Sequence, residues 1–182
     1  MMWEGGEQFK PDWDVFYMSQ AFLVSQRSVD RDTVHGACLV SSDHRLLSIG
    51  YNGPLRGAKP WSSDLEVRPN KYWLMIHSEE NCVLNYHGSY SDLEGSTLYV
   101  TGKPCHRCIN TVAQKGISGI IFGSVGSKCI DAEDDLARTA IIRSVKLGKN
   151  DFSLRKFERM NEVIDLLYRT IAYIDYKEND NG

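Results

Sequence analysis

The chain has 182 residues, 42% of them hydrophobic and 25% charged, and its net charge is −3. This length suits one domain with a well-buried core and is short for two. The negative charge disfavours a protein whose main partner is a long nucleic acid, since such proteins usually carry a basic surface. The apolar runs are too short to cross a bilayer, and the first residues lack the pattern of a signal peptide. We therefore expect neither nucleic acid nor a membrane as a partner, and a cytoplasmic location, the host cytosol if the gene is viral.

The first part of the chain predicts a helix, a hairpin and a long loop. Apolar residues at helical spacing predict a helix over 12–27, with Asp12 as its N-cap. The segments 34–40 and 46–51 have the pattern of two strands joined by a tight turn. The segment 52–72 contains three prolines and two glycines, so we expect a loop there. A loop of about 20 residues in a compact domain usually has a function.

The second part of the chain alternates between strand-like and helix-like segments. Strands are predicted over 97–101 and 119–123, with a fifth near 150–154, and helices over 78–86, 105–115 and 133–146. A stripe of apolar residues from Phe157 to Ile174 predicts a final amphipathic helix, at about 155–175. The pattern is typical of an α/β sandwich whose sheet is antiparallel at first and parallel later. We expect a single domain over 1–182, with a core at about 12–147.

Two short fragments carry the chemistry of the sequence, His77-Ser78-Glu79 and Pro104-Cys105-His106-Arg107-Cys108. One imidazole and two thiolates can hold a zinc ion and leave its fourth position open. Glu79 is not needed as a ligand, and a carboxylate beside an open zinc can move protons to and from water. The pattern H-x-E followed by P-C-x-x-C is the signature of zinc deaminases that act on nucleobases.

Both fragments fall where helices are expected to begin, and the positive potential of a helix N-terminus favours the thiolate form of cysteine. Zinc lowers the pKa of water to about 7. In the expected reaction, Glu79 takes a proton from the attacking water, whose oxygen adds to C4 of a cytosine ring. Glu79 then protonates N3 and later the amine, so that ammonia leaves.

The remaining cysteines bear on a competing interpretation, a structural zinc, which needs a fourth ligand. Cys82 follows His77 by five residues and would point about 140° away on a regular helix. Cys38 and Cys129 are remote in sequence and would have to return in space. We expect Cys38 and Cys82 to be small buried side chains, and His106 to point away from the metal. An odd number of cysteines favours reduced thiols over a disulfide framework.

Several segments resemble zinc-dependent deoxycytidylate (dCMP) deaminases, particularly those of phages. The similar segments lie between about 14 and 121: Ser28-Val29-Asp30-Arg31-Asp32, Gly36-Ala37-Cys38-Leu39-Val40, Gly50-Tyr51-Asn52-Gly53-Pro54, His77-Ser78-Glu79-Glu80-Asn81, Thr97-Leu98-Tyr99-Val100-Thr101 and Pro104-Cys105-His106-Arg107-Cys108. The resemblance implies a cytidine-deaminase-like three-layer α/β/α sandwich with a mixed five-stranded sheet. It implies zinc on His77, Cys105 and Cys108, with Glu79 as proton shuttle.

The resemblance also implies a substrate and a mode of regulation. The activity it implies is the conversion of dCMP to dUMP and ammonia for thymidylate synthesis, with Asn52 binding the sugar hydroxyl. It further implies a homohexamer that dCTP activates and dTTP inhibits, with Mg²⁺ accompanying such triphosphate effectors. A turn residue tolerant of a left-handed conformation is the competing interpretation of Asn52.

The chain departs from the usual pattern of the family in three places. Pro54-Leu55-Arg56-Gly57 has an altered order, Gly102-Lys103 precedes Pro104, and no aromatic residue occurs over 123–128. The backbone carbonyl of Lys103 remains a candidate acceptor for the substrate amine. The small residues around Ser124, with Lys103 and Lys128, suggest room for further phosphates, so that dCTP would also be a substrate; a plain flexible loop is the alternative.

The long loop offers cations for a nucleotide, either substrate or effector. Its basic residues are interleaved with aromatic rings, a combination that suits nucleotides as well as subunit packing. These candidates are Arg56, Lys59, Arg68 and Lys71.

Two other functions use the same residues. A deaminase of tRNA or single-stranded DNA would share the zinc chemistry but should carry a basic groove. A non-catalytic zinc or nucleotide-binding module would be indifferent to the loss of Glu79.

Overall fold

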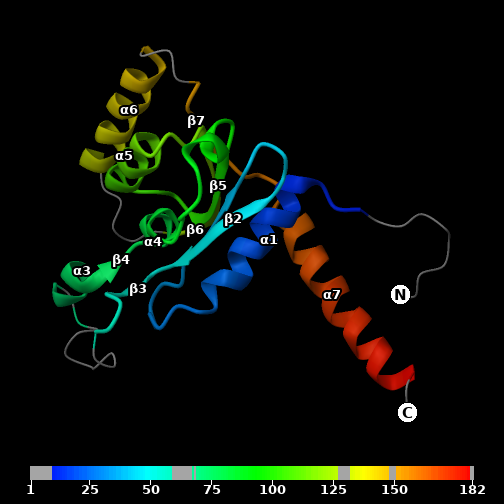
Figure 1. The fold of residues 1–182 in the computed structure, drawn as a ribbon. Coiled ribbons are helices and arrows are strands. Elements are labelled where there is room, and N and C mark those ends of the chain that lie inside the picture. Colours follow the sequence, from blue (N-terminus) through cyan, green and yellow to red (C-terminus); the bar gives the residue numbers. More distant parts are fainter. Residues whose placement is uncertain (1–9, 59–66, 68, 127–131, 148–150, 181–182) are drawn as a thin grey trace.

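The computed structural model describes residues 10–58, 67, 69–126, 132–147 and 151–180. A five-stranded sheet lies at its centre, and helices cover both faces (Figure 1). The strand order is β2-β1-β5-β6-β7. These strands are β1 (Gly36–Val40), β2 (Leu46–Tyr51), β5 (Thr97–Gly102), β6 (Gly119–Val125) and β7 (Ser153–Lys156). β1 pairs antiparallel with β2 and β5, whereas β5, β6 and β7 are parallel, which confirms the predicted mixed sheet.

Two helices cover one face of the sheet, α1 (Trp13–Ser25) and α7 (Met160–Asp180). The side chain of Asp12 accepts a hydrogen bond from the backbone N–H of Asp14 at 2.9 Å, so Asp12 caps α1 as predicted. Alternate residues along the strands point to opposite faces. The residues that face α1 and α7 form one core cluster with Val15, Met18 and Val163 of the helices: Cys38, Val40, Tyr99 and Ile121.

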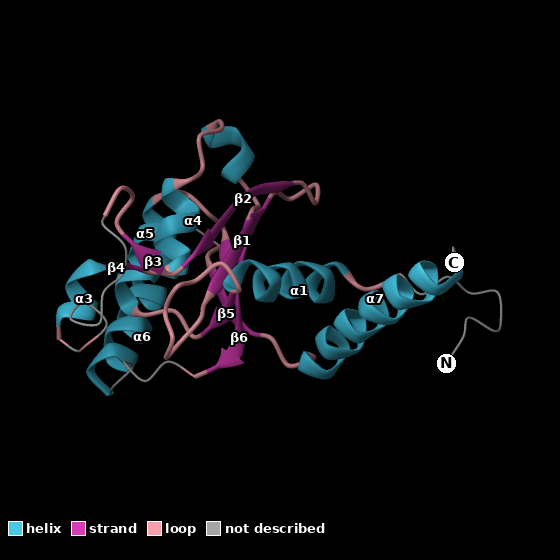
Figure 2. Cartoon of the chain, turned by 90° about the horizontal axis from the view of Figure 1, so that it is seen from below, coloured by secondary structure: helices cyan, strands magenta, loops and turns pink. Residues whose placement is uncertain are grey.

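Three helices cover the other face, namely α4 (Ser78–Leu84), α5 (His106–Gln114) and α6 (Ala132–Leu147). The intervening strand residues point to this side and form a second core cluster with Cys82, Ile109 and Val112: Ala37, Leu39, Leu98, Val100 and Ile120. Figure 2 shows the resulting three layers nearly edge-on. The predicted α/β/α sandwich is thereby confirmed.

The expectation of a plain loop over 52–72 is wrong in part. Gly53–Pro54 forms a short strand, β3, that pairs with β4 (Met75–Ile76), and a one-turn helix, α3 (Asn70–Leu74), precedes β4. A further short helix, η1 (Tyr90–Leu93), was not predicted either. Elements of two to five residues are too short to show a hydrophobic period, and they form here because tertiary contacts hold them.

The C-terminal part differs slightly from the predicted boundaries. The fifth strand is Ser153–Lys156, and α7 starts at Met160 rather than near 155. The first half of α7 packs on α1, and its second half extends away from the sheet in both views (Figures 1 and 2). Among the residues described, no helix combines the length and apolar character needed to span a membrane.

Candidate functional site

The two chemical fragments converge at the N-termini of neighbouring helices. β4 leads directly into His77, which is the N-cap residue of α4, and β5 leads through Pro104 into Cys105, the N-cap residue of α5. Gly50 of β2 permits the close approach of α4. A Cβ atom there would lie 2.4 Å from the carbonyl oxygen of Ser78 and 2.2 Å from the amide nitrogen of Cys82. Any larger residue at position 50 would therefore push the first turn of α4, and with it His77, off the sheet.

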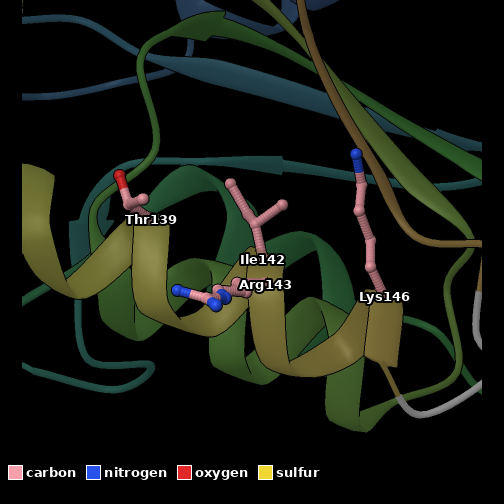
Figure 3. Close-up of a pocket in the computed structure, with 4 residues that line it drawn as sticks. All are labelled: Thr139, Ile142, Arg143 and Lys146. Atoms are coloured by element: carbon pink, nitrogen blue, oxygen red, sulfur yellow. The ribbon is translucent and has the colours of Figure 1, made fainter.

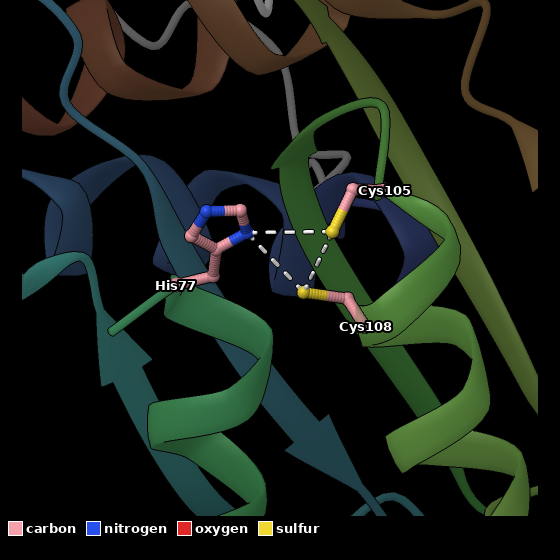
Figure 4. Close-up of side chains that lie close together, drawn as sticks. All are labelled: His77, Cys105 and Cys108. Atoms are coloured by element: carbon pink, nitrogen blue, oxygen red, sulfur yellow. Dashed lines mark hydrogen bonds between the residues drawn. The ribbon is translucent and has the colours of Figure 1, made fainter. Parts of the chain in front are cut away.

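Three side chains form a compact donor set (Figure 4). Nδ1 of His77 lies 3.5 Å from Sγ of Cys105 and 3.4 Å from Sγ of Cys108, and the two sulfur atoms are 3.5 Å apart. Ligands at ordinary Zn–N and Zn–S lengths, at tetrahedral angles, would be about 3.6–3.8 Å apart. The three atoms therefore have nearly the spacing of one face of a zinc tetrahedron.

No fourth His, Cys, Asp or Glu joins this donor set in the part of the chain that the structure describes. Cys38 and Cys82 are fully buried in the two core clusters, as predicted for small apolar side chains, and Cys129 lies outside the described residues. A structural zinc with four protein ligands thus lacks its fourth ligand among the described residues.

The electrostatics of the donor set favour a thiolate. The Cys105 sulfur is in hydrogen-bond contact with the Cys108 sulfur at 3.5 Å and lies beside His77, and these contacts lower the pKa of Cys105 to about 4. The same contact with Cys105 raises the pKa of His77 to about 9, against the effect of burial. The lowered pKa of Cys105 favours its thiolate, the form in which cysteine binds metals.

Glu79 occupies the first turn of α4, two residues after His77, and its side chain is only 6% exposed. Its Oε2 accepts a hydrogen bond from the Ser78 hydroxyl at 2.9 Å. Burial raises the pKa of Glu79, and positive charge on His77 opposes that effect. A buried carboxyl group with a raised pKa beside a metal site can carry a proton in both directions.

The N-terminus of α5 is held by α6, a contact that sequence reasoning missed. Arg138, 3% exposed, donates a hydrogen bond to the carbonyl oxygen of Pro104 at 3.3 Å and forms an ion pair with Asp134. The carboxylate of Asp134 accepts from the backbone N–H of His106 at 3.0 Å and lies 2.5 Å from Nδ1 of the same residue. His106 thus contacts α6 and is not part of the donor set, as predicted. In sequence, an Asp and an Arg four residues apart resemble an ordinary exposed pair.

Asn52, the candidate for the sugar hydroxyl, is buried at the end of β2. Its Oδ1 accepts from the backbone N–H of His35 at 2.7 Å. Its Nδ2 donates to the carbonyl oxygen of Thr33 at 2.9 Å and to Asp30 at 3.3 Å. Both amide hydrogens are therefore used within the protein, and a ligand hydroxyl would have to donate to the second lone pair of Oδ1.

The candidate cations have partners of their own where the structure describes them. Nζ of Lys71, a residue only 7% exposed, lies 2.7 Å from Asp30 and 3.3 Å from Asp32. Lys103 forms an ion pair with Asp135 at 2.5 Å, and Arg56 donates to the side chain of Asn85 at 3.1 Å. Ser124 is exposed on β6. The remaining candidates lie outside the described residues: Lys59, Arg68 and Lys128.

A separate hollow of about 430 Å³ lies along one face of α6 (Figure 3). Its lining residues are Thr139, Ile142, Arg143 and Lys146, and all of them belong to this helix. None of the metal-site residues contributes to it.

The fold of this chain is similar to that of a solved phage protein. A dCMP deaminase from the cyanophage S-TIM5, solved in complex with dCMP and dUMP, matches with a TM-score of 0.59. The match covers 82% of this chain and 100% of that one, at 23% identity. At this level of identity, the similarity shows that the two chains share a fold. The fold and the His-Cys-Cys site together define a cytidine-deaminase-like class of protein.

The sequence of this chain matches a known family. The family model described as "Cytidine and deoxycytidylate deaminase zinc-binding region" matches residues 11–124, which is more than half of the chain. The chain therefore belongs to the cytidine and deoxycytidylate deaminase family of hydrolytic enzymes.

Two relatives are deoxycytidylate deaminases. The human protein is 36% identical over 118 residues, 62% of this chain and 65% of its own length. The protein of Mycobacterium phage D29 is 33% identical over 126 residues, 62% of this chain and 95% of its own length. The matched region spans just under two thirds of the human relative.

Proposed function

We propose that this protein is a zinc-dependent deaminase of a free deoxycytidine nucleotide and converts dCMP to dUMP and ammonia. The observation that carries the proposal is the meeting of His77, Cys105 and Cys108 at 3.4–3.5 Å, with the buried carboxyl of Glu79 two residues from His77. The names of the relatives support dCMP as the substrate. In a cell the product dUMP would supply thymidylate synthesis, and free nucleotides of this kind suit a cytoplasmic enzyme.

His77, Cys105 and Cys108 would hold the zinc ion. When bound, zinc lowers the pKa of water toward neutrality and so supplies a nucleophile at neutral pH. Glu79 accepts a proton from the attacking water and delivers it to N3 of the pyrimidine ring. A second transfer through Glu79 protonates the amine on C4, the C–N bond breaks, and ammonia leaves as a carbonyl forms at C4. The raised pKa of Glu79 suits this two-way transfer.

The contacts to the rest of the nucleotide are a finer part of the proposal. Asn52 would accept a hydrogen bond from the sugar hydroxyl through the second lone pair of Oδ1, and the backbone carbonyl of Lys103 would accept one from the amine. The exposed Ser124, together with Lys128, would bind phosphate and admit dCTP as a second substrate. Arg56, Lys59 and Arg68 would bind the effectors dCTP and dTTP with Mg²⁺ in a homohexamer of single-domain chains. Lys71 would join them only by leaving its two carboxylate partners.

A substrate panel tests this function. Ammonia release would be measured with cytidine, deoxycytidine, CMP, dCMP, dCDP, dCTP and single-stranded DNA, each with and without dTTP. We expect the highest kcat/KM with dCMP and inhibition by dTTP. Turnover of the oligonucleotide alone would favour a polynucleotide deaminase, an outcome that the net charge of −3 disfavours. Turnover of none of them would refute the proposal.

A further inference from the structure

His35 stands at the entrance of β1, between two parts of the proposed site. Because β1 runs antiparallel to β5, the residue before Gly36 lies beside the end of β5. A Cβ atom on Gly102 would lie 2.5 Å from Cε1 of His35, so the imidazole packs directly on the backbone that leads to Cys105. On its other side, His35 is tied to Asn52 twice. His35 N–H donates to Asn52 Oδ1 at 2.7 Å, and Asn52 N–H donates to the His35 carbonyl at 3.1 Å.

The tautomer of His35 follows from its contact with Thr101. Nδ1 of His35 lies 3.1 Å from the hydroxyl of Thr101, which also accepts from the backbone N–H of Gly36 at 3.2 Å. Thr101 is fully buried. Among the described residues, His35 Nδ1 is the only acceptor within reach of the Thr101 hydroxyl hydrogen. A buried hydroxyl hydrogen needs an acceptor. Nδ1 therefore accepts, and the proton of the neutral ring sits on Nε2.

The second ring nitrogen is left for a ligand. Nε2 makes no hydrogen bond within the described part of the chain, and the residue is half-buried, so the ring is not sealed from solvent. Burial and, after it, positive charge on His77 lower the pKa of His35, while Asp30 opposes them, and this direction favours the neutral ring that the contact with Thr101 indicates. An oriented N–H donor thus lies between Asn52 and the strand end that leads to the metal site.

The chemistry of cytosine indicates which atom this donor meets. In the proposed reaction, Asn52 binds the sugar, and C4 reacts near the metal ligands, so the pyrimidine ring lies between them. The ring has two acceptors, N3 and the C2 carbonyl oxygen, and N3 exchanges its proton with Glu79. We infer that His35 donates a hydrogen bond from Nε2 to the C2 carbonyl oxygen of the bound pyrimidine and is a specificity-determining residue of this site. The inference rests on the proposed function, and it gives a reason to reject adenine, which has no carbonyl.

Variants of His35 test the contact through KM and kcat for dCMP. His35→Leu removes the donor, and we expect KM to rise about five- to tenfold, the usual effect of one lost neutral hydrogen bond, with zinc content unchanged. His35→Gln restores an N–H of similar reach and should recover KM to within about twofold. The matched control is His87→Gln, an exposed histidine beyond the end of α4, for which we expect wild-type constants. An unchanged KM in His35→Leu overturns the inference.

A modified substrate tests which atom is contacted and needs no variant. The sulfur of 2-thio-dCMP is a weaker acceptor than oxygen, so the wild-type protein should show a KM about five- to tenfold higher for 2-thio-dCMP than for dCMP. The His35→Leu variant should show similar KM values for the two substrates. Equal constants of the wild type for both substrates overturn the carbonyl contact. So does a His35→Leu penalty that disappears with deoxycytidine, since the partner would then be the phosphate.

The inference and the proposed function fail in different ways. If the wild-type protein releases no ammonia from dCMP, the proposed function falls. The binding of dCMP and 2-thio-dCMP to the zinc-loaded protein, measured by calorimetry, then decides the role of His35 by itself. Weaker binding of 2-thio-dCMP supports the contact, and equal binding, or none of either nucleotide, overturns it.

Discussion

At the scale of single residues, His77, Glu79, Cys105 and Cys108 combine two functions in a small volume. The imidazole and the two cysteine sulfurs have the spacing of a zinc site, and the buried carboxyl group with its raised pKa can carry a proton in the proposed reaction. Among the described residues, the carboxyl accepts hydrogen bonds from the Ser78 hydroxyl and from its own backbone N–H, and no distant side chain donates to it. It is thus left available for a substrate.

Replacing one ligand should release the metal. In Cys105→Ser the hydroxyl stays protonated at neutral pH and is a poor zinc ligand, so we expect less than a tenth of the wild-type zinc content after gel filtration. The melting temperature should fall as well, because metal binding stabilises the fold. Zinc per chain and thermal unfolding measure both effects.

The control for that variant is Cys82→Ala, which removes a buried thiol outside the donor set. This variant should keep one zinc per chain. Its melting temperature should fall slightly, because the removed thiol leaves a small cavity in the core. Full zinc occupancy in Cys105→Ser would show that the metal is held elsewhere.

At the scale of secondary-structure elements, the buried pair of Lys71 and Asp30 joins α3 to the connection between α1 and β1. In Lys71→Met the carboxylate of Asp30 stays buried without its cation, and we expect a loss of about 3–5 kcal/mol in the free energy of unfolding. The double variant Lys71→Met/Asp30→Asn should recover part of this loss. Urea denaturation of the three proteins measures it.

An exposed ion pair provides the comparison for Lys71. Arg45 and Asp43 lie 2.8 Å apart in the hairpin, with more than half of each side chain exposed. Arg45→Met should therefore change stability by less than about 1 kcal/mol. A similarly small change in Lys71→Met would mean that the hydrogen bonds from Asn52 and from the backbone N–H groups of Asp32 and Thr33 are enough to hold the Asp30 carboxylate without Lys71.

The contacts of α6 with Pro104 and His106, on either side of Cys105, lead to a second prediction at this scale. Arg138→Gln removes the guanidinium that holds the Pro104 carbonyl and Asp134. Residues that orient metal ligands typically affect affinity or activity by about 10–100-fold, and we expect such a loss in zinc affinity. Arg143→Gln, on the exposed side of the same helix, should leave it unchanged. Competition with a chromogenic chelator measures the zinc affinity of both variants. An affinity of Arg138→Gln equal to that of the wild type would exclude this role of α6.

The elements that were predicted correctly are those whose signal is local. The meeting of His77, Cys105 and Cys108 follows from two short motifs, and α1 follows from an apolar stripe that begins after its cap Asp12. The contacts of Asn52 with His35, of Lys71 with Asp30 and of Arg138 with Pro104 were missed because the partners lie 17 to 41 residues apart in sequence. β3 and α3 were missed because so few residues show no periodicity.

At the scale of the whole molecule, α7 leaves a row of apolar side chains in solvent. Five of them are about half exposed or more: Ile164, Tyr168, Ile171, Tyr173 and Ile174. Apolar surface of this kind usually marks an interface. With the proposed homohexamer, we expect sedimentation velocity in the presence of dCTP and Mg²⁺ to give six chains of 20.7 kDa. A monomer under these conditions would contradict that part of the proposal.

The most direct test of the proposed chemistry is ammonia release from dCMP by Glu79→Gln, measured together with zinc content. Glutamine fills the same space but cannot carry a proton, so we predict one zinc per chain, an unchanged fold and a kcat at least about 100-fold below that of the wild type. A Glu79→Gln protein that retains zinc and deaminates dCMP at close to the wild-type rate would contradict the assignment of Glu79 as the proton carrier of a zinc-dependent deaminase.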